Sequence, residues 1–95
     1  MPRSTWERDS RRQICDRLLS EVLPCTSVES ATFDQLAEEL LELHLSMRGK
    51  HPDTMSMELI EIAGIAINML VGRPGGEVDE GFAEWTERHG EGKDE

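Results

Sequence analysis

The chain has few cysteines and no long apolar run. It holds two cysteines in 95 residues, Cys15 and Cys25, which are too few for a disulfide framework and a weak signal for a metal or redox site. The apolar stretch at 62–71 is interrupted by Asn68 and is too short to cross a bilayer. No apolar segment of signal-peptide type follows the charged N-terminus. These absences predict a soluble, cytoplasmic protein with reduced thiols and no membrane partner.

Positive charge is also scarce. The chain has 20 acidic and 10 basic residues and a net charge of −10. A field of this sign repels a nucleic-acid backbone, so nucleic acid is not expected as a partner. The same charge permits divalent cations, basic proteins, or a phosphate ligand that arrives with its own metal.

Apolar residues recur at helical spacing and predict four helices, with no strand pattern or internal repeat. Ser4, Thr32 and Asp53 are expected to cap the first three helices. The expected helices cover about residues 4–23, 32–48, 53–72 and, for a short fourth helix, 78–90. The fold class is therefore all-α, a small four-helix domain over residues 1–90, followed by a charged, disordered tail at 91–95.

The third helix carries two carboxylates on an otherwise apolar surface. Apolar residues surround its axis, which predicts a buried helix. Glu58 and Glu61 are three residues apart and are therefore neighbours, and Asn68 extends the same polar stripe. The helix has no Lys or Arg, and a buried charge without a partner is costly. We therefore expect a counter-charge from elsewhere.

The second helix supplies more carboxylates in place of a cation. Glu38, Glu39 and Glu42 form the run Glu-Glu-x-x-Glu. Gly49 and Pro52 bracket a short turn after it, so the second and third helices are expected to form an antiparallel hairpin.

This hairpin would place four carboxylates opposite one another, those of Glu39, Glu42, Glu58 and Glu61. They repel strongly unless cations occupy the centre, and all-oxygen ligation suits Mg²⁺ or Mn²⁺. The alternative is that these glutamates lie on a solvated surface, which applies most readily to Glu38.

The two motifs resemble those of the MazG-type, all-α nucleoside triphosphate pyrophosphohydrolases. The family signature is Glu-Glu-x-x-Glu on one helix and Glu-x-x-Asp on the next. The chain has Glu38-Glu39-Leu40-Leu41-Glu42 and Glu58-Leu59-Ile60-Glu61, and the likeness covers about residues 32–72. Glu61 stands where the family usually has Asp. The resemblance implies that Glu39, Glu42, Glu58 and Glu61 are metal ligands and that Glu38 is an auxiliary catalytic carboxylate.

The activity that this resemblance implies is Mg²⁺- or Mn²⁺-dependent hydrolysis of a nucleoside triphosphate to the monophosphate and pyrophosphate. The metal would bind phosphate oxygens and activate a water, and Glu38 could accept its proton. Between the third helix and Arg88, Arg73 is the only basic residue. Two alternatives are an acidic interaction protein that mimics nucleic acid on a basic partner surface, and a degenerate family member that keeps the metal alone.

Three further residues are candidates for substrate binding. Arg11 could reach phosphates held near the carboxylates, although a solvated side chain is the alternative. Lys50 at the hairpin turn could do the same, or complement the helix C-terminus. Asn68 is the third candidate, because it lies on the same polar stripe of the third helix as Glu61. His44 and His51 show no metal-ligand spacing with cysteine and are interpreted as structural.

The third helix also indicates self-association. Ile60, Ile67 and Val71 lie on the side away from its core-facing residues, and exposing them would leave an apolar patch. A homodimer or higher homo-oligomer is therefore expected. Phe82 and Trp85 of the fourth helix, expected in the core, could instead cover this side within one chain.

Overall fold

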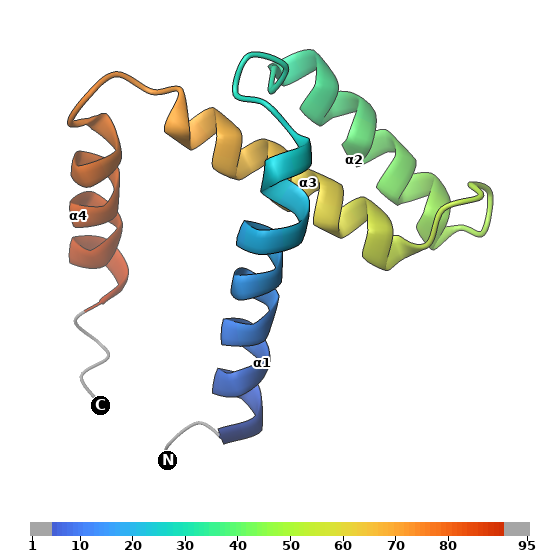
Figure 1. Cartoon of the computed structure of the whole chain (residues 1–95), viewed down its shortest axis with the longest axis horizontal. Coiled ribbons are helices and arrows are strands. Elements are labelled where there is room, and N and C mark those ends of the chain that lie inside the picture. Colours follow the sequence, from blue (N-terminus) through green and yellow to red (C-terminus); the bar gives the residue numbers. More distant parts are fainter. Residues whose placement is uncertain (1–4, 91–95) are drawn as a thin grey trace.

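The computed structural model describes residues 5–90 as four α-helices joined by short connections (Figure 1). The α-helices are α1 (Thr5–Arg17), α2 (Phe33–Met47), α3 (Met55–Val71) and α4 (Glu77–His89), and α1 continues into a π-helical segment η1 (Leu18–Val22) and a 3₁₀ turn η2 (Leu23–Cys25). The expected all-α, four-helix fold is confirmed. None of these helices has both the length and the apolar character needed to cross a membrane. The expected Ser4 cap and the tail at 91–95 lie outside the described residues.

Helices α2 and α3 lie side by side and antiparallel, as the sequence predicts (Figure 1). Gly49 ends α2 with a φ of +72°, a left-handed conformation that glycine adopts without strain. Its N–H donates to the Ser46 carbonyl at 3.0 Å, and the Lys50 N–H donates to the Leu45 carbonyl at 2.8 Å. These two bonds form a Schellman motif. The Ser46 hydroxyl also donates to the Asp53 carbonyl at 2.9 Å, which ties the turn to α2.

Threonines cap both helices of the hairpin. Thr32 accepts a hydrogen bond from the Gln35 N–H at 3.2 Å, as expected. Thr54 caps α3 by accepting from the Met57 N–H at 3.1 Å, so the prediction of Asp53 was wrong by one residue. The reason is geometric, because Thr54 has the extended backbone that aims its oxygen at the first turn, whereas Asp53 lies in the preceding turn.

The core sits where η1 meets the middle of α3. Among residues 5–90, Leu18 and Ile65 are the hydrophobic side chains that are buried. η1 packs directly on α3 at Gly64, where an added Cβ would make an ordinary van der Waals contact of 3.5 Å with Val22 Cγ1. Figure 1 shows α1 running away from this crossing and α4 standing apart from the hairpin.

Much apolar surface stays exposed in the single chain. Phe82 and Trp85 are 65% and 60% exposed, so their expected place in the core was wrong. Within the single chain, Ile60 and Val71 of α3 are exposed, so the burial of this side of α3 against a second copy stays a prediction. In the described part of the chain, α2 and η1 pack on α3, and α4 packs along no other helix. The radius of gyration is 15.8 Å, against about 12 Å for a compact domain of this length.

Candidate metal centre

Four glutamates converge between α2 and α3. Glu39 and Glu42 come from α2, and Glu58 and Glu61 come from α3. One carboxylate oxygen from each lies within 4.8 Å of all the others. The three-residue spacing in each helix puts both members on one face, and the Schellman turn holds the two faces together. The structure thus brings together the four residues that were expected as metal ligands.

Glu58 is the most deeply buried member of the carboxylate cluster, with 0% of its side chain exposed. Within residues 5–90, neither of its carboxylate oxygens accepts a hydrogen bond from an N–H or hydroxyl donor, and neither does Glu39 Oε1. A buried carboxylate without a donor or a counter-ion is strongly destabilising. These oxygens are therefore placed to receive a cation or a shared proton.

The pKa values of Glu39 and Glu58 are raised, so the carboxylate cluster can hold a proton that reduces the repulsion between its members. Burial raises the pKa of Glu39 to about 8, and hydrogen bonding to Glu61 and Glu58 and the charges of Glu61 and Glu42 act in the same direction. Burial also raises the pKa of Glu58; a hydrogen bond with Glu39 opposes this rise. Binding of a divalent ion would release the shared proton, because metal ligation requires the ionised carboxylate.

The donor set fits a hard divalent ion. Opposite ligands of an ion with metal–oxygen distances of about 2.1 Å are about 4 Å apart. A spacing of at most 4.8 Å therefore needs only small side-chain rotations. Carboxylate oxygens are typical ligands of hard divalent ions such as Mg²⁺, Ca²⁺ and Mn²⁺.

A polar cavity of about 250 Å³ adjoins the carboxylate cluster. Glu39 and Glu61 form one side of it, and Asn68 lies in the same lining. Asn68 is buried, and its Nδ2 donates to Thr26 Oγ1 at 2.8 Å, which fastens α3 to the segment that leads into α2. The other lining residues include several hydroxyl and amide side chains, those of Ser27, Ser30 and Gln35.

The remaining candidates lie outside the carboxylate cluster. Glu38 is exposed on α2, and Lys50 is exposed in the hairpin turn. Arg11 forms an ion pair with Glu7 one turn earlier on α1 and does not line the cavity. The roles assigned to these residues remain predictions.

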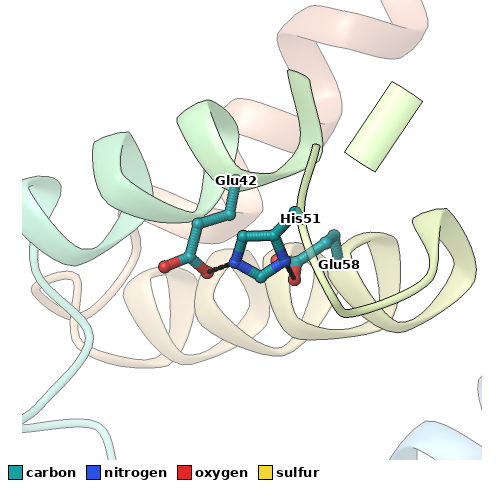
Figure 2. A group of neighbouring side chains, drawn as sticks. All are labelled: Glu42, His51 and Glu58. Carbon is teal, nitrogen blue, oxygen red and sulfur yellow. Dashed lines mark ion pairs between the residues drawn. The ribbon is translucent and has the colours of Figure 1, made fainter. Parts of the chain in front are cut away.

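His51 is the residue that sequence reasoning missed. Its ring lies between the carboxylates of Glu42 and Glu58 (Figure 2). Nε2 is 3.9 Å from Glu42 Oε1, and Nδ1 is 3.5 Å from Glu58 Oε2. The interpretation as structural considered only spacing relative to cysteine. The available signal was its position in the short turn between the two glutamate motifs.

Searches of protein-family models, curated proteins and solved structures found no match to the chain. The MazG-like resemblance therefore stays a prediction that rests on the two glutamate motifs.

Proposed function

We propose that the chain is a Mg²⁺- or Mn²⁺-dependent nucleoside triphosphate pyrophosphohydrolase of the MazG-like type. One observation carries the proposal. Four carboxylates, in the order and spacing of the two motifs, converge on a helical hairpin around the buried Glu58, whose oxygens accept no hydrogen bond from an N–H or hydroxyl donor within the described residues. A solvated glutamate surface would not produce this burial.

In the proposed reaction, water cleaves the bond between the α- and β-phosphates and yields the monophosphate and pyrophosphate. The bound ions would supply positive charge for the phosphate oxygens and lower the pKa of a water. Glu39, Glu42, Glu58 and Glu61 would hold these ions, which also overcome the repulsion between a −10 chain and a polyanion. Glu38, exposed beside Glu39 in sequence, would accept the proton of the attacking water.

The cavity beside Glu39 and Glu61 would receive a neighbouring part of the substrate, with Asn68 in its wall. We place the protein in the cytoplasm, since Cys15 and Cys25 are free thiols, as in reducing compartments.

The test is a pyrophosphate-release assay across the common ribo- and deoxyribonucleoside triphosphates, with Mg²⁺ and with Mn²⁺. Glu39→Gln and Glu61→Gln each remove a ligand charge at nearly constant volume. We expect each to lower hydrolysis at least about 100-fold, because changes in the outer shell of a metal site alone cost about 10–100-fold. Glu80→Gln, at an exposed position on α4, is the matched control and should leave the rate unchanged. Hydrolysis that survives both ligand changes would contradict the assignment.

The acidic interaction protein is less well supported, because a fully buried Glu58 cannot contact a basic partner surface. The same assay also tests the remaining alternative, a degenerate family member that keeps the metal alone. Metal binding without pyrophosphate release from any nucleotide would indicate a family member that has kept the ion and lost the reaction.

A further inference from the structure

A second group of possible ligands overlaps the carboxylate cluster at the turn end of the hairpin. It consists of Glu42, His51 and Glu58, whose ligand atoms also lie within 4.8 Å of one another (Figure 2). His51 is 18% exposed, and the turn that carries it is fixed by the Schellman bonds and by the bond from Ser46 to Asp53. The imidazole is therefore held beside Glu58 by a defined backbone.

One hydrogen bond of the His51 ring indicates which of its two nitrogens carries no proton. The backbone N–H of Asp53 donates to Nδ1 at 3.2 Å, so Nδ1 is an acceptor and carries no proton. In the neutral ring the proton then belongs to Nε2, on the side of Glu42. Nδ1 has one lone pair, which accepts the Asp53 N–H in this structure, and a metal bound at Nδ1 would take the place of that N–H. The Nδ1 atom lies 3.5 Å from Glu58 Oε2, which is itself an acceptor.

Two acceptors at this separation do not bind each other, but they can bind one ion. Adjacent ligands of an octahedral ion with bond lengths of about 2.1 Å are about 3 Å apart. The distance of 3.5 Å between Nδ1 and Oε2 is close to that spacing and too long for a strong hydrogen bond. A cation between the two atoms would satisfy Oε2, which accepts no hydrogen bond from an N–H or hydroxyl donor within residues 5–90.

We propose that His51 is a metal ligand through Nδ1, paired with Glu58, and that Glu42, whose Oε1 lies 3.9 Å from Nε2, supplies the negative charge on the Nε2–H side of the ring as well as a ligand oxygen to the centre. A metal-bound histidine commonly donates its other N–H to a carboxylate, which fixes its orientation. An imidazole ligand suits Mn²⁺, Co²⁺ and Zn²⁺ better than Mg²⁺, which binds oxygen almost exclusively. His51 therefore makes the centre selective for transition metals over Mg²⁺. This inference rests on the metal centre of the proposed function but not on hydrolysis.

The direct test is pulsed EPR of the wild-type protein loaded with Mn²⁺, which needs no variant to fold. The expected spectrum shows the ¹⁴N modulation of a directly bound imidazole nitrogen. Its absence from a protein that binds Mn²⁺ would overturn the role of His51.

Calorimetric titrations with Mn²⁺ and with Mg²⁺ give an independent measurement. His51→Gln should raise the Kd for Mn²⁺ about 10-fold or more and leave the Kd for Mg²⁺ nearly unchanged. His44→Gln, at an exposed position on α2, is the matched control and should change neither. If His51 were a cationic counter-charge instead, its removal would tighten both ions alike, which would overturn the proposal.

The two proposals fail separately. Bound Mn²⁺ with the ¹⁴N signal but no pyrophosphate release supports the His51 ligand and rejects the enzyme. Glutamate-dependent hydrolysis without the ¹⁴N signal supports the enzyme and rejects the His51 ligand. A wild-type protein that binds no Mn²⁺ rejects both.

Discussion

The α2–α3 hairpin and the two outer helices, α1 and α4, are built in opposite ways. The hairpin helices begin at threonine caps and are joined by a Schellman turn, and between them they hold the carboxylate cluster around the buried Glu58. The outer helices hold exposed apolar side chains, among them Trp6, Ile14, Phe82 and Trp85. Helix α4 begins at Gly76 without a side-chain cap. The chain thus fixes its backbone where charge is buried, whereas exposed apolar side chains occur in both regions, including Leu41 and Val71 of the hairpin.

This contrast indicates what each region lacks. The hairpin has buried negative charge and needs a cation, whereas the exposed apolar side chains, which lie on all four helices, need a protein surface. The accessible area of 7602 Å² exceeds the roughly 5,500 Å² typical of a compact chain of 10.7 kDa. Phe82 and Trp85 do not supply the missing cover, since both are exposed. A second copy of the chain remains the expected cover.

The largest effect is expected from a charge on the apolar side of α3. Ile60→Glu should convert a wild-type assembly of at least twice 10.7 kDa into a monomer. Burial of each aliphatic side chain at the interface contributes about 1.5–3 kcal/mol to association, and a buried charge would remove this stabilisation. Light scattering at micromolar concentration measures the mass. Gln13→Glu adds the same charge at an exposed position on α1 and serves as the control. A wild-type mass near 10.7 kDa, independent of concentration, would show that the prediction is wrong.

A smaller effect on the melting temperature of the full chain is expected from a change of pH in the presence of EDTA. This effect arises in the hairpin, where Glu39 lies. The pKa of Glu39 is about 8 in the folded chain, against an ordinary value of 4.5. Between these values the folded state holds a proton that the unfolded chain has lost, so the free energy of unfolding falls as pH rises. The melting temperature should therefore fall from about pH 5 to about pH 8.

Glu39→Gln replaces the titrating carboxyl by a neutral amide and is the control for this experiment. The groups that face Glu39 are Glu42, Glu58 and Glu61, with His51 beyond Glu58. Burial also raises the pKa of Glu58, so a smaller residual slope from Glu58 is expected in this variant. A wild-type melting temperature that rises over the same interval would contradict the account.

The smallest effect is expected at the start of α3. Thr54→Ala removes the oxygen that accepts from the Met57 N–H and should cost about 1 kcal/mol in the free energy of unfolding. Thr54→Ser keeps the oxygen and should stay within a few tenths of wild type. Urea unfolding of both variants measures the difference, and an equal loss in both would mean that the hydroxyl does not cap the helix.

The hairpin and its carboxylate cluster could be predicted because they depend on local rules. Glycine after a helix, a threonine cap and a three-residue glutamate spacing act over one or two turns, and together they placed Glu39 and Glu42 opposite Glu58 and Glu61. The cap of α3 was misplaced by one residue, since Asp53 and Thr54 both suit that role and only the turn geometry selects Thr54.

The remaining features depend on distant parts of the chain or on a partner. The apolar faces of α3 and α4 predict burial but do not specify the surface that buries them, so the exposure of Trp85 could not be foreseen. The position of His51 in the short turn between the two glutamate motifs placed it near the carboxylates, but only the path of the turn brings its ring between Glu42 and Glu58.

The most direct measurement of the central claim is the thermal unfolding of wild-type protein in EDTA and in millimolar Mn²⁺, with Glu61→Gln melted alongside. If the carboxylate cluster binds the ion, Mn²⁺ at 100 times its Kd should stabilise the folded state by about 2.7 kcal/mol and raise the melting temperature clearly. Glu61→Gln should lose most of that rise. Identical melting temperatures of the wild-type protein in EDTA and in Mn²⁺ would contradict the metal centre.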